Sequence, residues 1–209
     1  MVMRMSNRGR LLVLSGPSGT GKSTVVRGLV QHSDRLRLSV SATTRSPRGY
    51  ETEGVDYFFL AAEEFRRRIV DGEMLEYANY NGNYYGTPQD AVDAWLDEGY
   101  DVLLEIEVQG ALQVKERRPD AILVFLVPPS MKEAEARLRG RGSEDDATVR
   151  ARLAIAAGEI RQAIHYDYIV VNHTVEQAVE DIGAVLRAAH LSAEAMEGHL
   201  ENLLAECPL

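Results

Sequence analysis

Short apolar runs alternate with amphipathic segments along most of the 209-residue chain. A run without polar alternation predicts a strand that is buried on both faces, as in a parallel sheet. The regular succession of such strands and helix-like segments therefore predicts an α/β fold with a parallel-sheet core. The predicted strands occupy residues 10–15, 101–108, 121–127 and 167–172, and the first is followed by a predicted helix at 23–31.

The stretch 38–87 interrupts this pattern because it is rich in Tyr, Thr, Arg and Gly. It predicts strands at 57–60 and 75–80, with a short helix at 62–71 that ends at Gly72. These elements are expected to form a small mixed lobe that is inserted between elements of the core.

A second interruption at residues 130–165 predicts two helices joined by a polar turn, with Ser143 as the N-cap of the second. Another helix is expected at 88–98, with Pro88 at its first position and Gly99 after its end. The chain 1–209 is thus interpreted as a single domain whose core comprises residues 10–37, 88–129 and 166–190.

The C-terminal segment 191–209 predicts one extra helix at 192–204. One face of this helix is apolar and carries Met196, Leu200, Leu203 and Leu204. Such a face is expected to pack on the domain or on a partner subunit, so a homo-oligomer is one possibility.

The composition argues against several classes of binding partner and site. A formal net charge of −9 argues against broad nucleic-acid binding, which needs basic surface. Cys207 is the single cysteine, so neither an internal disulfide framework nor a thiolate metal site is expected. The apolar run at 11–14 is far too short for a signal peptide or a membrane span. We expect a cytoplasmic protein that binds neither nucleic acid nor membrane, with its five histidines at the surface or at helix ends.

The segment GPSGTGKS at 16–23 follows the first predicted strand and opens the first predicted helix. Its glycines allow consecutive backbone N–H groups to turn toward phosphate oxygens, and the helix dipole adds positive potential. Lys22 is placed to reach the β- and γ-phosphates, and Ser23 is placed to hold Mg²⁺. The segment predicts a nucleoside triphosphate site. Since the chain is short and lacks the guanine-reading N-K-x-D of GTPases, a kinase for a small acceptor is favoured.

The loop VSATTRSPRGYE at 40–51 has the chemistry of a second anion site. Arg45 and Arg48 carry guanidinium forks that suit a phosphate, and tyrosines at 57 and 85 supply further donors. Glu76 would repel a phosphate, but together with Ser41 and Thr87 it complements the donors and acceptor of a guanine edge. Glu51 fits a solvated surface loop about as well as a ligand site.

Four motifs in order, GPSGTGKST, SVSATTRSPR, GNYYGT and RLRGRG, resemble the guanylate kinases of bacteria over roughly residues 10–190. The resemblance implies transfer of a phosphoryl group from ATP to GMP, with Mg²⁺ as cofactor. It also implies that 38–87 is a GMP-binding lobe and that 130–165 is a lid.

By matched positions, the resemblance assigns ATP binding to Arg137 and to the nine P-loop residues Gly16, Pro17, Ser18, Gly19, Thr20, Gly21, Lys22, Ser23 and Thr24. The GMP site would comprise Ser41, Arg45, Arg48, Glu51, Tyr57, Glu76, Tyr85, Thr87, Glu105 and Glu107. The catalytic charges would be Lys22, Arg48, Arg141 and Arg152, and Ser23 would be the metal ligand.

The chain departs from the family at Glu105-Ile106-Glu107, where the family often has Asp-Ile-Asp. If this stretch continues the strand, both carboxylates point to the same side. One is then expected to help bind Mg²⁺ through water, and the other to touch the guanine amino group.

Two other functions are compatible with parts of the sequence. A non-catalytic binding module of the same fold would not need the intact P-loop, and a P-loop kinase for another phosphorylated acceptor would not need Ser41, Glu76 and Thr87 together. Production of ADP with a panel of acceptors discriminates between these readings.

Overall fold

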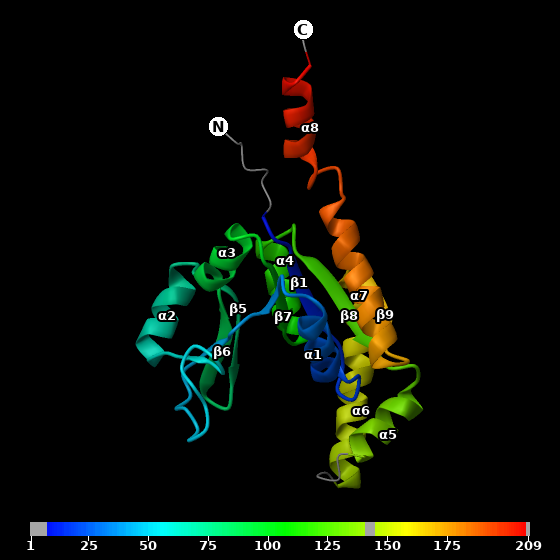
Figure 1. Ribbon diagram of the computed structural model, residues 1–209. Helices are drawn as coiled ribbons and strands as arrows, with labels where there is room; N and C mark the ends of the chain where they lie inside the picture. Colours follow the sequence, from blue (N-terminus) through cyan, green and yellow to red (C-terminus); the bar gives the residue numbers. More distant parts are fainter. Residues whose placement is uncertain (1–7, 141–144, 208–209) are drawn as a thin grey trace.

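The computed structural model describes residues 8–140 and 145–207. Within them, five parallel strands form a sheet in the order β2–β7–β1–β8–β9 (Figure 1). The α/β fold with a parallel-sheet core is therefore confirmed. The strands are β1 (Leu11–Ser15), β2 (Leu36–Leu38), β7 (Asp101–Glu105), β8 (Ile122–Val127) and β9 (Tyr168–Val171).

Alternate side chains of the central strand β1 enter two separate cores. Val13 is fully buried in the core on one face of the sheet, and Leu12 is fully buried in the core on the other. This explains why the first four residues of β1, Leu11 to Leu14, are all apolar. Helices α3 (Gln89–Asp97) and α4 (Val108–Arg117) contribute to the first core, and α1 (Lys22–His32) and α7 (Val175–His190) contribute to the second.

A second sheet of four strands follows the order β4–β3–β6–β5. A tight turn through Asn81 and Gly82, both at positive φ, joins β5 to β6 in the manner of an Asn-Gly hairpin. Phe65 is fully buried and stacks on the ring of Tyr84, with 5.4 Å between ring centroids. The elements are β3 (Ala42–Thr43), β4 (Phe58–Phe59), β5 (Met74–Tyr80), β6 (Asn83–Pro88) and α2 (Ala62–Val70).

Two helices, α5 (Met131–Arg139) and α6 (Asp146–Arg161), follow β8, and a 3₁₀ turn (Gln162–His165) connects them to β9. Ser130 caps α5 by accepting a hydrogen bond from the backbone N–H of Glu133. The cap of α6 is Asp145, which accepts from the N–H of Thr148, so the predicted cap Ser143 is wrong. Ser143 itself lies outside the described residues. Figure 1 shows α5 and α6 on the opposite side of the central sheet from the second sheet.

Three predicted boundaries are wrong. Strand β7 ends at Glu105, and the residues up to 108 leave the sheet. Pro88 is the N-cap of α3 and the last residue of β6, so the helix begins one residue later than expected. The C-terminal helix α8 (Glu197–Ala205) is shorter than predicted and buries none of its residues.

Helix α8 projects away from the body of the molecule (Figure 1). Leu200, Leu203 and Leu204 on it are between 49% and 71% exposed, so the described part of the chain does not cover its apolar side. In the described segments, we find no helix with the length and apolar character needed to cross a membrane.

Candidate active site

The P-loop connects β1 to α1 at the carboxyl edge of the central sheet. Gly21 has φ 83° and precedes α1, a left-handed conformation that glycine adopts without a steric penalty. No side chain caps α1, so its first N–H groups are available to an anion. The ammonium group of Lys22 donates to the carbonyls of Gly16 and Pro17. The sequence motif and its strand–loop–helix context are thus brought together as predicted.

A carboxylate from the neighbouring strand meets the P-loop. The hydroxyl of Ser23 donates to Oε1 of Glu105 at 2.9 Å, because β7 pairs with β1 and Glu105 aligns with Leu14. Hydroxyl and carboxylate oxygens are the ligand types that Mg²⁺ prefers, with phosphates and water completing its shell. The described residues contain no cluster of three His, Cys, Asp or Glu suited to a metal. The donor set therefore fits a cation that is held largely by a bound nucleotide.

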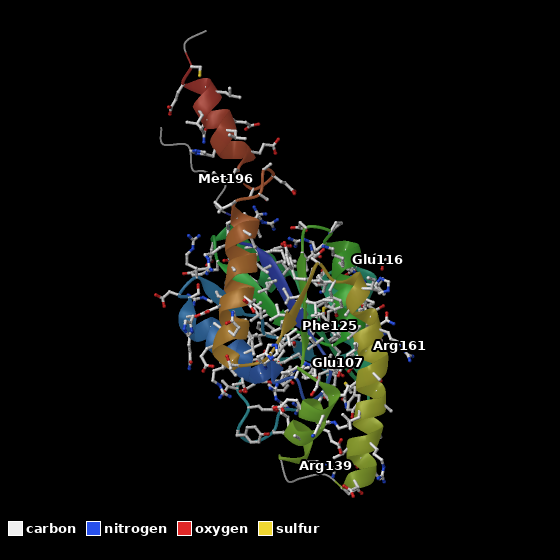
Figure 2. All side chains as sticks on the ribbon, turned by 90° about the vertical axis from the view of Figure 1, so that its right-hand side faces the viewer. Glu107, Glu116, Phe125, Arg139, Arg161 and Met196 are labelled. Atoms are coloured by element: carbon white, nitrogen blue, oxygen red, sulfur yellow. The ribbon has the colours of Figure 1, made fainter. Side chains whose placement is uncertain are left out.

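Glu105 and Glu107 do not share a strand face, so the expectation based on period-two alternation is wrong. Glu105 ends β7, whereas Glu107 is the residue that precedes α4. The backbone leaves the sheet between them, where Ser15 donates through its hydroxyl to the carbonyl of Ile106. Figure 2 shows Glu107 between Phe125 of the core and Arg139 of α5.

Glu76 is a buried carboxylate on β5, with 7% of its surface exposed. Its Oε1 accepts from the hydroxyl of Thr87 at 2.7 Å, since the two residues are register partners on β5 and β6. Burial raises the pKa of the Glu76 carboxyl, the Thr87 hydrogen bond opposes that shift, and the negative charge of Glu107 adds to it. The predicted pair is therefore in direct contact in a site of low polarity.

Helix α4 packs directly against Glu76, which sequence reasoning missed. A Cβ on Gly110 would lie 2.9 Å from Oε2 of Glu76, so any larger residue there would force the carboxylate to shift. Gln113 lies one turn further along α4 and exchanges hydrogen bonds with both backbone groups of Tyr77. The sequence held a weak signal for this contact, a glycine inside a helical pattern.

The arginine loop is organised around an internal ion pair. Two nitrogens of the Arg45 guanidinium donate to the two carboxylate oxygens of Glu51, at 2.9 and 2.8 Å. The same carboxylate accepts from the backbone N–H of Arg48. The Arg45 hydrogen bond, followed by that from the Arg48 backbone, lowers the pKa of Glu51. Glu51 therefore orients the loop.

Tyr57 and Tyr85 lie beside this ion pair. The Arg45 guanidinium lies 5.4 Å from the centre of the Tyr57 ring, and the Tyr57 and Tyr85 rings meet edge to face at 6.2 Å. The phenol of Tyr85 also raises the pKa of Arg45, after the larger effect of Glu51. Arg48 is exposed, and its Nη1 donates to the hydroxyl of Tyr50. Ser41 immediately precedes β3 at the same lobe.

Comparison with known proteins decides the family. The guanylate kinase family model matches residues 8–189. The chain belongs to the guanylate kinase family. It is 49% identical to the guanylate kinase of Streptococcus thermophilus over 203 residues, which cover 97% of each chain. It is 47% identical to that of Latilactobacillus sakei over 203 residues, which cover 97% of this chain and 100% of the relative.

A solved structure agrees with this assignment. The crystal structure of guanylate kinase from Anaplasma phagocytophilum superposes with a TM-score of 0.67 at 36% identity, and covers 88% of each chain. The reaction of the guanylate kinase family is transfer of the γ-phosphoryl group of ATP to GMP, which gives ADP and GDP. The chain is accordingly an ATP:GMP phosphotransferase with ATP and GMP as substrates, and the two other readings are not favoured.

In this guanylate kinase fold, a side chain of α5 contacts the P-loop. The guanidinium of Arg137 donates to the carbonyl of Thr20 at 3.3 Å and to that of Asn172 at 3.1 Å. Asn172 is buried at the end of β9, and its amide donates to the same Thr20 carbonyl at 2.6 Å. Asn172 was missed because nothing in its local sequence marks it.

The second helix, α6, contributes Arg152, which is half-buried. Arg141 lies outside the described residues. Burial raises the pKa of the Glu159 carboxyl on α6, while the charge of Lys22 opposes that shift and the charge of Glu107 adds to it. Glu159 is thus within electrostatic range of the P-loop lysine and of the residue that precedes α4.

Proposed function

We propose that the reaction is divided between a base-reading pair, a phosphate-holding loop and a triphosphate loop. The buried contact between Glu76 and Thr87 carries the proposal. The Glu76 carboxylate accepts from Thr87 and has acceptor capacity left for guanine N1–H and N2–H₂. Ser41 supplies a hydroxyl donor for guanine O6, and Thr87, which gives its hydroxyl proton to Glu76, orients the carboxylate toward the base. Adenine presents an acceptor at N1, so it meets the same carboxylate unfavourably.

The phosphate of GMP is proposed to bind Arg45, Arg48, Tyr57 and Tyr85. The Arg45–Glu51 ion pair supports this because it fixes the guanidinium before a ligand arrives, which lowers the entropic cost of binding. Glu51 then serves GMP indirectly, by holding Arg45 and the Arg48 backbone in place.

ATP is proposed to bind the P-loop from Gly16 to Thr24, with Lys22 exchanging its carbonyl partners for phosphate oxygens. Ser23, supported by Glu105, would hold the Mg²⁺ that accompanies ATP and adds positive charge beside the phosphates when it is bound. Glu107 is proposed to lie near the guanine amino group, because its charge acts on Glu76.

Positive charge around the transferred group is the main requirement of the reaction, since the acceptor is an ionised phosphate oxygen. Lys22, Arg48, Arg137 and Arg152 are proposed to supply it, together with Arg141. The GMP lobe at 38–87 and the lid at 130–165 must approach each other to align donor and acceptor and to exclude water. A cytoplasmic location and a homo-oligomer both stay predictions.

A panel of acceptors tests the proposal. ADP production is measured with GMP, AMP, CMP and UMP at equal concentrations, with ATP and Mg²⁺ in excess. GMP should be preferred over AMP by about 10⁴-fold or more in kcat/KM, as for sites built on hydrogen bonds to their substrate. Comparable rates with AMP would contradict the role of Glu76 and leave the P-loop assignment intact.

A further inference from the structure

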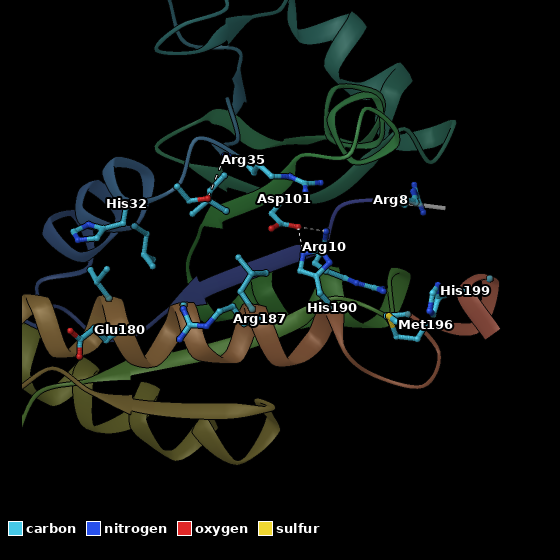
Figure 3. A pocket seen from close by; sticks show the side chains of 18 residues that line it. Arg8, Arg10, His32, Arg35, Asp101, Glu180, Arg187, His190, Met196 and His199 are labelled. Atoms are coloured by element: carbon cyan, nitrogen blue, oxygen red, sulfur yellow. Dashed lines mark hydrogen bonds and ion pairs between the residues drawn. The ribbon is translucent and has the colours of Figure 1, made fainter. Parts of the chain in front are cut away.

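A cavity of about 600 Å³ lies at the amino ends of the central strands, on the opposite edge of the sheet from the P-loop. Arg10 just before β1 and Asp101 at the start of β7 line one side of it. The last turn of α1, the side of α7 and the beginning of α8 form the other walls (Figure 3). None of the described residues that line it belongs to the nucleotide sites above, so the cavity is separate from the active centre.

The cavity is basic in a chain that is acidic overall, with a net charge of −9. Three histidines and two carboxylates, those of Asp101 and Glu180, also face it. The positive charges that line it belong to Arg8, Arg10, Arg35 and Arg187.

Two of these arginines already have partners. Arg8 forms ion pairs with Asp93 and Asp97 on α3, at 2.7 and 2.8 Å. Arg35 donates to the carbonyl of Gly99 at 2.8 Å. Both guanidinium groups are therefore engaged within the protein.

Asp101 is also satisfied within the protein. One of its oxygens accepts from the backbone N–H of Arg10 at 2.7 Å and lies 2.8 Å from Nε2 of His190 (Figure 3). Asp101 is only 7% exposed, so its carboxylate is part of the cavity wall and its hydrogen bonds are made within the protein. The Asp101 charge does not form an ion pair with the guanidinium of either Arg10 or Arg187 in the described chain.

The guanidinium groups of Arg10 and Arg187 are without a hydrogen bond or ion pair to any other described residue. The Nε of Arg10 is buried and unsatisfied, which is costly for a charged donor. Arg187 lies back along α7 over Gly183, where a Cβ would come within 3.3 Å of its Nη1. Both groups are thus positioned at the cavity with their donors unused.

We infer that this cavity binds a phosphorylated small molecule. A phosphate monoester carries about −1.5 to −2 charges at pH 7 and accepts bidentate hydrogen bonds from a guanidinium group, so phosphate groups suit the unused donors at this cavity. A volume of this size is in the range of small-molecule sites. The organic part would lie on the apolar wall, formed by Leu29, Leu36, Val179, Leu186 and Met196.

Calorimetric titration of the full-length protein tests this inference. Both nucleotide sites are first saturated with a non-reacting analogue that joins adenosine to guanosine through a phosphate chain. Pyrophosphate, fructose 1,6-bisphosphate and citrate are then titrated in turn. Both phosphates should bind with a stoichiometry of one, the sugar bisphosphate more tightly because of the apolar wall, and citrate at least about tenfold more weakly than the bisphosphate.

Substitutions locate the binding. Arg187→Gln and Arg10→Gln should each weaken binding of the bisphosphate at least about tenfold, since each removes charge-assisted hydrogen bonds. Arg66→Gln is the matched control, because Arg66 is an exposed arginine on α2 that does not line the cavity. Arg187 is exposed on its helix, so its variant tests the idea even if Arg10→Gln fails to fold.

Several results overturn the inference. The cavity would not be a phosphate site if neither phosphate bound the saturated protein, or if citrate bound as tightly as the bisphosphate. Equal losses for Arg66→Gln and Arg187→Gln would place the binding elsewhere. Because the nucleotide sites are filled throughout, failure here leaves the assignment of the active site untouched.

Discussion

The proposed triphosphate loop and the proposed base-reading site would hold a nucleotide by opposite means. The loop is one continuous segment whose backbone turns toward the ligand, with Gly21 at positive φ and an uncapped helix behind it. The base-reading site is built from buried side chains on separate segments, such as Glu76 on β5 and Thr87 on β6. In the proposed division, backbone groups would bind the phosphates whatever the base, whereas the side chains would select one base. Substitutions in the two regions should therefore fail in different ways.

The largest effect is expected for Lys22→Ala. This change removes a charge next to the transferred group, so kcat should fall by about a thousandfold or more. The fold should persist, because Lys22 begins α1 at its exposed end and adds no core packing. Turnover and circular dichroism are measured on the same sample. Near-normal turnover in a folded variant would remove the P-loop from the mechanism.

Glu76→Gln should act on base selection. The amide keeps the shape but replaces one acceptor with a donor and removes the charge. The stabilisation of the transition state with GMP should therefore fall by about 2–4 kcal/mol, and kcat/KM for GMP should fall by the corresponding factor. ATP affinity should not change, and discrimination against AMP should shrink because the amide offers adenine N1 a donor. Steady-state kinetics with both acceptors provide the measurement.

Arg45→Ala is the control for that comparison. It should weaken GMP and AMP alike, because phosphate contacts carry no base information. If Arg45→Ala altered the GMP/AMP ratio as much as Glu76→Gln does, the lobe would not separate phosphate holding from base reading.

Arg152→Ala should lower kcat by roughly a hundredfold, with a much smaller change in KM for GMP. Arg152 lies on α6 in the proposed lid, where a contact with the transferred group would form mainly in the closed transition state. Separate determination of kcat and KM tests this role. A change confined to KM would make Arg152 a ground-state binding residue instead.

The smallest effect concerns stability. The pKa of Glu76 is raised in the folded protein, so its ionised form costs stability at neutral pH. Glu76→Gln should therefore raise Tm by a few degrees at pH 8, while it impairs catalysis. This gain should shrink as pH falls through the raised pKa and vanish below about 4.5, the ordinary value, where both folded and unfolded states are protonated.

Thermal unfolding of the wild type and of Glu76→Gln from pH 4 to pH 8 measures the difference. Thr87→Val is a useful companion, because it removes the hydroxyl that stabilises the Glu76 charge and should lower Tm at pH 8. A gain for Glu76→Gln that did not depend on pH would show that the charge of Glu76 is not its source.

The sequence alone was sufficient to predict features that depend only on neighbouring residues. The P-loop follows from its glycine pattern, and β1 follows from its apolar run. The stretch 101–108 was misassigned because Ile106 and Val108 continue an apolar alternation, although Val108 already belongs to α4. The hydrogen bond from Ser15 to the carbonyl of Ile106, where the strand ends, is a tertiary contact that local sequence does not reveal.

Contacts between distant segments could not be predicted in the same way. Gly110 accommodates Glu76, and Asn172 holds the P-loop at Thr20, but neither has a local pattern that names its partner. The basic cavity is the extreme case, because Arg10 and Arg187 are separated by most of the chain. The sequence pattern does not show which distant segments lie next to each other, because tertiary packing determines that arrangement.

The link between Gln113 and Tyr77 has a consequence for motion. It fastens β5 to α4 through two hydrogen bonds of 3.2 and 3.1 Å, and Arg117 adds a bond to the carbonyl of Met74. Strand β5 is the edge of the second sheet at which these bonds are made, while β3, which leads to Arg45, lies two strands away. A rotation of the lobe about this seam would move Glu76 little relative to the core and would carry the arginine loop through a longer arc, because Glu76 lies on the fastened strand and the loop does not.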